Sequence, residues 1–229
     1  MLNNTISDVF FDLDHTLWDF EKNSALALDA ILKKYNIKVS LEDFLEQYIP
    51  VNFKYWELYR EDKISQETLR YGRLKETFDK LGLDIDDETI NVLSVEYIAY
   101  LPKFNHLFEG TIEILDYLKS KYKLHIITNG FHEVQRYKLK NSEIQHYFET
   151  ITDSEKAGVK KPNPLIFQYA LNAAKANPAN SVMIGDCFEA DVKGALNFGL
   201  DAIYFNEHHA EVTQEIKQIN HLLDLKRYL

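Results

Sequence analysis

Four short apolar runs, each followed by a polar motif, limit the fold of this chain more than any other feature of its sequence. They lie at residues 9–13, 124–128, 181–184 and 202–205. Each has the length and the apolar content of a strand that is buried on both faces of a sheet. Apolar residues recur with helical spacing before or between the last three runs, at residues 111–122, 164–176 and 189–198. This alternation predicts an α/β fold with a doubly wound parallel sheet.

The long segment between the first and second runs has a different pattern. It contains no convincing strand, but it holds four amphipathic stretches, at residues 24–35, 41–59, 65–81 and 87–100. A segment of that length without secondary structure would be unusual inside a compact domain. We therefore expect two domains: a core of residues 1–16 and 105–229, and an α-helical domain of residues 17–104 inserted after the first strand.

Charge and composition restrict the partners and the compartment. Acidic residues outnumber basic ones by 36 to 26, which gives a formal net charge of −10, and such a surface repels nucleic acid. Cys187 is the only cysteine, no basic and apolar leader opens the chain, and no apolar run approaches the ~20 residues of a membrane span. We expect a cytoplasmic, soluble protein with a small-molecule substrate and neither nucleic acid nor membrane as partner. A monomer and a homodimer both remain open.

The polar motif after the first run is Asp12-Leu13-Asp14-His15-Thr16. Side chains alternate along extended backbone, so Asp12, Asp14 and Thr16 can point to one side. Two carboxylates in one small volume repel each other unless a divalent cation lies between them or one of them holds a proton. Either arrangement is chemically useful. An acidic loop that is simply exposed to solvent could have the same sequence.

Two further motifs lie at the end of the second apolar run and between the second and third runs. Thr128-Asn129-Gly130 follows the second run, and a hydroxyl together with exposed backbone N–H groups can hold phosphate oxygens. Lys160 and Lys161 precede Pro162, where the chain approaches a helix. Taken alone, the first of these motifs is an ordinary turn and the second is a solvated pair of lysines.

The last motif places Asp186 after the third run and Asp191 five positions later. Ligands of parallel α/β sheets bind beyond the carboxyl ends of the strands. The four motifs therefore occur in order at the expected strand ends. They supply carboxylates, a hydroxyl, a lysine and further carboxylates. Coincidence is a poor explanation for the full set.

These motifs resemble those of the haloacid dehalogenase superfamily in its phosphatase form. FDLDHT, ITNG, KKPNP and GDCFEAD match the superfamily's four ordered motifs, and the match covers residues 9–205. The helical insertion is similar to the cap that this superfamily carries at the earlier of two positions. Within the superfamily, DHTLWDF and FKYWELYREDKISQETLRYGRLKETF look most similar to pyrimidine 5'-nucleotidases that act on noncanonical nucleotides.

The resemblance implies a magnesium-dependent phosphomonoester hydrolase with an aspartyl-phosphate intermediate. Asp12 would attack phosphorus, and Asp14 would act first as acid and then as base. The implied phosphate ligands are Thr128, Asn129 and Lys161. Lys161 is preferred to Lys160 because the family's lysine directly precedes proline. The implied Mg²⁺ ligands are Asp12, the backbone carbonyl of Asp14, Asp186 and Asp191.

Substrate choice is expected to depend on aromatic and cationic residues of the inserted domain, which could stack on a base or meet its polar edge. The candidates are Phe53, Tyr55, Trp56, Tyr71 and Arg73. The expected substrates are dUMP, dTMP and UMP. A phosphatase of small sugar or organic-acid phosphates, such as phosphoglycolate, and a phosphomutase are the alternatives. His15 is expected to pack rather than to catalyse, and Thr16 to orient the first loop.

Three other classes fit the motifs less well. The dehalogenase branch uses the first aspartate on carbon but lacks a second acid at the position of Asp14. A phosphorylation-switch receiver carries its acceptor on a later strand and is about half as long. A binding module without catalysis would not need the complete set of acid, hydroxyl and lysine.

Overall fold

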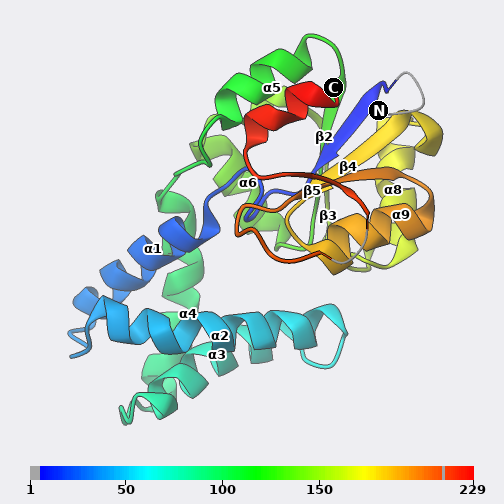
Figure 1. The fold of residues 1–229 in the computed structure, drawn as a ribbon. Coiled ribbons are helices and arrows are strands. Elements are labelled where there is room, and N and C mark those ends of the chain that lie inside the picture. The colour runs from blue at the N-terminus through cyan, green and yellow to red at the C-terminus, as the bar shows by residue number, and fades with distance from the viewer. Residues whose placement is uncertain (1–5, 213–214) are drawn as a thin grey trace. The chain divides into compact units, whose positions relative to one another are not determined.

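The chain divides into two compact units in a computed structural model that describes residues 6–212 and 215–229 (Figure 1). The first unit comprises Met1–Phe20 with Asn105–Leu229, and the second comprises Glu21–Phe104. No helix within the described part of the chain is both long enough and apolar enough to span a membrane.

A parallel sheet of six strands forms the centre of the first unit. In sheet order the strands are β3 (Phe148–Asp153), β2 (Lys123–Thr128), β1 (Asp8–Phe11), β4 (Ser181–Gly185), β5 (Asp201–Phe205) and β6 (Lys217–Ile219). The predicted α/β class and parallel sheet are confirmed. Sequence patterns missed β3, which is polar and only partly buried at its centre, and β6, which has only three residues.

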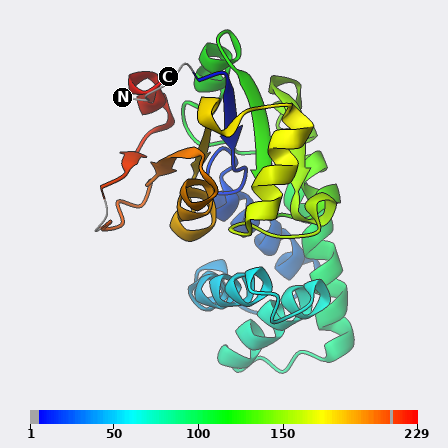
Figure 2. The same cartoon turned by 90° about the vertical axis from the view of Figure 1, so that its right-hand side faces the viewer.

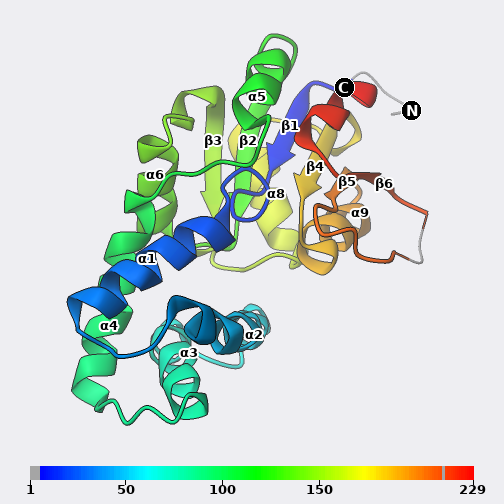
Figure 3. The same ribbon diagram turned by 60° about the vertical axis from the view of Figure 1, so that its left-hand side comes forward.

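Helices cover both faces of this sheet, as a doubly wound fold requires (Figures 2 and 3). Apolar residues of α8 (Pro164–Ala174) and α9 (Gly194–Phe198) pack against alternate residues of the strands, among them Phe10, Ile127 and Met183. On the other face α5 (Thr111–Lys119) contacts β2 and the 3₁₀ helix η5 (Leu222–Arg227).

The remaining helical segments of this unit are short. They are α6 (His132–Asn141), α7 (Ser154–Ala157), η2 (Gln145–Tyr147), η3 (Pro178–Asn180) and the π-helical segment η4 (Phe188–Lys193). Asn163 caps α8 as predicted, since its side chain accepts a hydrogen bond from the backbone N–H of Leu165.

Strand register places the carboxyl ends of β1, β2 and β4 side by side. Phe11, the last residue of β1, is paired with Ile126 of β2 and with Ile184 of β4. The next residue, Asp12, remains attached to this edge because its backbone N–H donates to the carbonyl of Ile184 at 2.9 Å. The polar residues that follow these three strands therefore share one edge of the sheet.

The second unit is α-helical. Its helices are α1 (Phe20–Lys34), which begins at the last residue of the first unit, α2 (Leu41–Arg60), α3 (Gln66–Lys80) and α4 (Asp87–Tyr100), followed by η1 (Leu101–Lys103). Side-chain oxygens of Ser40, Ser65 and Asp86 accept backbone N–H groups at the first turns of α2, α3 and α4. These caps satisfy donors that a helix leaves without intrahelical partners.

Aromatic residues form the core of the helical unit. The rings of Phe44 and Phe78 lie 5.5 Å apart, and those of Tyr48 and Tyr97 lie 6.2 Å apart. The hydroxyls of Ser24 and Tyr97 are hydrogen-bonded at 2.7 Å. These contacts tie α1 and α4 to α2 and α3, so the four helices share one core.

The boundary between the units lies later than residue 17. Leu17 and Trp18 are fully buried, and Trp18 forms isolated β-bridges with Asp14 and Leu107. The next residue, Asp19, donates its backbone N–H to the carbonyl of His106 at 3.1 Å. Residues 17–20 are therefore part of the sheet-containing unit, although they follow the first motif directly.

Candidate active site

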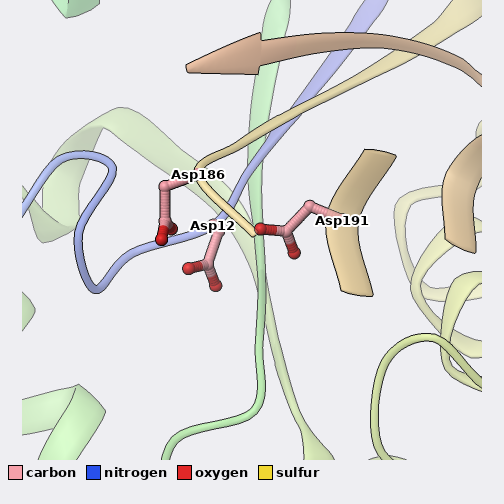
Figure 4. Close-up of side chains that lie close together, drawn as sticks. All are labelled: Asp12, Asp186 and Asp191. Atoms are coloured by element: carbon pink, nitrogen blue, oxygen red, sulfur yellow. The ribbon is translucent and has the colours of Figure 1, made fainter. Parts of the chain in front are cut away.

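Three carboxylates from separate segments meet beyond the carboxyl ends of β1 and β4 (Figure 4). Asp12 follows β1, Asp186 follows β4, and Asp191 belongs to η4. One oxygen from each residue lies within 4.8 Å of the others. The structure thus brings together three of the residues that the sequence indicated as metal ligands.

Neighbouring backbone and hydroxyl groups hold two of these carboxylates in place. Thr16 Oγ1 donates to Asp186 Oδ1 at 3.1 Å and accepts the backbone N–H of Asp186 at 3.0 Å. The Asp191 Oδ2 atom accepts the backbone N–H of Cys187 at 3.0 Å. A Cβ at position 185 would overlap the Asp191 carboxylate, so Gly185 allows this close approach.

The donor set fits a hard divalent cation. Carboxylate oxygens are the ligands that Mg²⁺ prefers. Asp191 Oδ1 is a buried acceptor without a hydrogen bond among the described residues, although Lys161 Nζ lies 2.6 Å away as an ion-pair partner. Lys161 brings one positive charge to the three carboxylates, so the set keeps negative charge that a divalent cation would balance.

Lys161 is the cation of the site. Its Nζ lies 2.6 Å from Asp12 Oδ1, 2.6 Å from Asp191 Oδ1 and 2.7 Å from the carbonyl oxygen of Ile127. The side chain is 2% exposed, so this geometry supports Lys161 over Lys160. Although burial acts to lower it, the pKa of Lys161 is raised by the Asp12 and Asp191 carboxylates, and the ammonium stays charged.

Burial also changes the acidity of the carboxylates. Loss of solvent raises the pKa of Asp12 to about 7, against the opposing effect of Lys161 and with a further contribution from Asp191. The pKa of Asp186 is raised well above its usual value, first by burial and then by the charges of Asp12 and Asp191. The site therefore has an excess of negative charge that a bound cation would relieve.

Thr128 has its hydroxyl hydrogen available for a ligand. The Oγ1 atom accepts the backbone N–H of Gly130 at 3.1 Å and Nε2 of Gln135 at 2.8 Å. Both of these bonds use oxygen lone pairs, so the hydroxyl can still donate. This geometry suits the predicted contact with a phosphate oxygen.

The side chain of Asn129 is directed toward Lys161. Its Oδ1 accepts the Lys161 backbone N–H at 2.7 Å, and its Nδ2 donates to the Lys161 carbonyl at 3.0 Å. The amide is therefore committed to positioning the lysine. Phosphate binding by Asn129 remains a prediction for its backbone N–H alone.

Asp14 lies against helix α6, which the sequence patterns did not predict. Lys138 Nζ lies 2.5 Å from Asp14 Oδ1, and Gln135 Nε2 donates to Asp14 Oδ2 at 2.8 Å. Gln135 and Lys138 are thus site residues that sequence reasoning missed. Their spacing of three positions on a helix was a signal, because such side chains lie on one face.

His15 and Thr16 occupy the turn after Asp14. His15 has a left-handed backbone, with φ of 63°, and its ring packs 4.8 Å from that of Phe20. Burial lowers the pKa of His15 to about 4, which keeps the imidazole neutral. Thr16 orients Asp186 through the two hydrogen bonds described above.

The predicted specificity residues lie in the helical unit, where their surroundings differ. Phe53 is 54% exposed, whereas Arg73 is buried and donates to Asn52 Oδ1 at 3.0 Å. Tyr71 donates its hydroxyl to Asp87 at 2.6 Å. Tyr55 lies over Gly72, where a Cβ would overlap its ring, and Trp56 packs edge-on against Tyr59. Their part in substrate choice remains a prediction.

The fold and the site define an α/β protein whose parallel sheet has helices on both faces and carries a buried lysine among carboxylates at its carboxyl edge. The chain belongs to the haloacid dehalogenase-like hydrolase family, whose model matches residues 8–199. The family expected from the four motifs is confirmed, and the chain is an enzyme of the hydrolase class.

Two relatives and one solved structure match nearly the whole chain. The pyrimidine 5'-nucleotidase YjjG of Escherichia coli (strain K12) is 33% identical over 213 residues, covering 91% of this chain and 89% of the relative. The pyrimidine 5'-nucleotidase PynA of Streptococcus pneumoniae (strain ATCC BAA-255 / R6) is 31% identical over 224 residues, covering 94% and 93%. A magnesium-bound crystal structure of the HAD-hydrolase YfnB from Bacillus subtilis is 26% identical, with a TM-score of 0.90 and coverage of 98% and 99%.

Proposed function

We propose that this enzyme is a magnesium-dependent phosphomonoester hydrolase that works through an aspartyl-phosphate on Asp12. The observation that carries the proposal is the position of Asp12, with Lys161 Nζ 2.6 Å away and carboxylate oxygens of Asp186 and Asp191 within 4.8 Å. A nucleophile, a fixed cation and a set of oxygen ligands at one point are what phosphoryl transfer needs.

Asp12, Asp186 and Asp191 are the side chains that would hold Mg²⁺, together with the backbone carbonyl of Asp14. Bound there, the ion would reduce the repulsion between the carboxylates and a phosphate and would stabilise charge on the phosphate oxygens. The solved relative YfnB, with its magnesium, supports this part of the proposal.

In the first half-reaction, a carboxylate oxygen of Asp12 forms a bond to phosphorus while the bond from phosphorus to the ester oxygen breaks. Asp14 gives its proton to the departing alkoxide. Lys161 and the hydroxyl of Thr128 offer an ammonium and a hydrogen-bond donor to the phosphate oxygens. The products of this step are the free alcohol and the aspartyl-phosphate.

In the second half-reaction, a water oxygen forms a bond to phosphorus, and the bond from phosphorus to Asp12 breaks. Asp14, now a carboxylate, takes a proton from that water. Inorganic phosphate leaves, Asp12 is again a carboxylate, and Asp14 again holds a proton. One residue thus serves as acid and then as base.

We propose pyrimidine nucleoside monophosphates, represented by dUMP, dTMP and UMP, as the substrates. The names of the two relatives support this choice, and aromatic side chains such as Phe53 and Trp56 could stack on a base. A panel of phosphate esters tests it. The specificity constant is expected to be highest for a pyrimidine nucleotide, and a maximum for phosphoglycolate or a hexose phosphate would refute this assignment.

The variant Asp12→Asn tests the chemistry itself. It removes the nucleophile with almost no change in volume, so Mg²⁺-dependent phosphate release should disappear while thermal unfolding stays cooperative. Asp84→Asn, at an exposed position of the helical unit, is the matched control and should keep full activity. Turnover by Asp12→Asn at the wild-type rate would contradict the proposed nucleophile.

A further inference from the structure

Helix α6 binds both oxygens of one carboxylate. Lys138 Nζ lies 2.5 Å from Asp14 Oδ1, and Gln135 Nε2 lies 2.8 Å from Asp14 Oδ2. These residues are separated from Asp14 by 124 and 121 positions in the sequence. An oxygen that accepts one N–H group still has a lone pair that can hold a proton, so these contacts are compatible with the acid and the base form of Asp14. The carboxyl group cannot rotate about its last torsion without losing at least one of the two hydrogen bonds.

The two donors are themselves buried and held. Lys138 and Gln135 are 2% and 1% exposed. The Lys138 ammonium lies 4.2 Å from the ring centroid of Trp18 and 5.2 Å from that of Phe20, which favours the cation in this place. A Cβ at position 130 would overlap the Gln135 amide, so Gly130 makes room for it.

Gln135 also connects Asp14 to Thr128, the last residue of β2. Its Nε2 donates to Thr128 Oγ1 as well as to Asp14 Oδ2, each at 2.8 Å. One amide group therefore occupies a lone pair of the Thr128 hydroxyl and also helps to orient Asp14.

We propose that Lys138 and Gln135 are positioning residues for the acid–base step, and that Gln135 couples Asp14 to the hydroxyl that receives the phosphate. This inference rests on the proposed phosphatase function. A catalytic group held in its productive orientation avoids an entropic cost in each turnover. Both residues act through Asp14 and Thr128, without touching the reacting atoms themselves.

Leaving groups of different basicity separate this role from a merely structural one. The alkoxide that leaves dUMP needs a proton from Asp14, whereas p-nitrophenolate leaves without one. The specificity constant kcat/KM reports the steps up to formation of the aspartyl-phosphate. A defect in the orientation of Asp14 should therefore lower kcat/KM for dUMP much more than for p-nitrophenyl phosphate.

The experiment compares Lys138→Met, Lys138→Arg and Gln135→Met with wild type on both substrates. We expect Lys138→Met to lower kcat/KM for dUMP about tenfold or more and for p-nitrophenyl phosphate by less than about threefold. Lys138→Arg, which keeps a cation, should recover part of the loss. Gln135→Met should also raise KM for both substrates, because Thr128 loses a hydrogen bond. Lys140→Met, at an exposed position of the same helix, should match wild type.

Three outcomes would overturn the inference. They are equal losses on the two substrates in both Lys138 variants, unchanged kinetics in Lys138→Met, and an equal change of leaving-group dependence in Lys140→Met. Should Lys138→Met fail to fold, Lys138→Arg and Gln135→Met are used instead. For each of them the ratio of kcat/KM for dUMP to kcat/KM for p-nitrophenyl phosphate is compared with the wild-type ratio. A wild-type enzyme inactive on every phosphate ester would instead refute the proposed function.

Discussion

Asn129 holds the backbone of Lys161 with both ends of its side-chain amide, accepting from the N–H at 2.7 Å and donating to the carbonyl at 3.0 Å. The two residues follow different segments and are 32 positions apart. This pair of hydrogen bonds fixes the position of the Lys161 backbone, from which the side chain reaches Asp12. The turn after β2 therefore positions the cation of the site as well as the hydroxyl of Thr128.

Asn129→Ala should lower kcat/KM strongly and should change the free energy of unfolding only slightly. Loss of two hydrogen bonds leaves the Lys161 backbone free to shift, and misplacement of a binding group by about 1 Å can cost up to 100-fold in rate. We expect kcat/KM to fall about tenfold or more, measured with a nucleotide substrate. Asn177→Ala removes a comparable bond at an exposed helix start and should change stability only. Equal kinetic effects of the two variants would show that Asn129 has no special role.

Magnesium should stabilise the wild-type fold, because the carboxylates of Asp12, Asp186 and Asp191 repel one another without it. A ligand at a hundredfold excess over its Kd adds about 2.7 kcal/mol to the free energy of unfolding. This stabilisation should raise the Tm of the wild-type protein when Mg²⁺ is added. The increase in Tm should be much smaller for Asp186→Asn. Asp84→Asn is again the control. An Asp186→Asn protein that gains as much as wild type would place the metal elsewhere.

His125 should make the fold less stable in mild acid. Its ring lies buried in β2, with Nε2 3.1 Å from Asp8 Oδ1 and Nδ1 2.9 Å from Thr150 Oγ1. Burial lowers the pKa of His125, although the Asp8 carboxylate opposes the shift. The unfolded chain therefore binds the proton more readily, and the contribution of the neutral ring is complete above the unfolded pKa of about 6.5.

As the pH falls below the unfolded pKa of about 6.5, the stability that the neutral His125 ring contributes is lost at up to about 1.4 kcal/mol per pH unit. Urea unfolding at several pH values, for wild type and for His125→Gln, measures the difference directly. Raised pKa values at Asp12 and Asp186 act with the opposite sign, so only the difference between the two proteins isolates His125. His146→Gln, at an exposed site, serves as the control. A difference that does not change with pH would refute this prediction.

Much of the candidate site could be predicted because its chemistry lies in short motifs at strand ends. Asp12 directly follows a buried apolar strand, and Asp186 follows another. Parallel strands with alternating helices must present their carboxyl ends at one edge. The order of the motifs was therefore enough to indicate a shared pocket and a family.

The boundaries and the polar strands were less accessible to pattern reasoning. β3 has partly exposed residues at its centre, and β6 is three residues long, so neither shows the apolar run of a buried strand. Trp18 lies just after the first motif, but its β-bridge with Leu107 keeps it in the sheet-containing unit. Pairing with a distant segment cannot be seen in a local pattern.

The sequence alone was sufficient to indicate Asp12, Lys161, Asp186 and Asp191 as site residues. Asp12 and Asp186 were indicated by their places after apolar strands, and Lys161 by its place before a proline, as in the family's motif. The orientation of Asp14 and the task of Asn129 were not available in this way. Gln135 and Lys138 lie on a polar helix without a motif, and the Asn129 amide could have faced a ligand instead. Folding resolved both points, because hydrogen bonds between residues far apart in the sequence depend on packing, which local residue preferences do not specify.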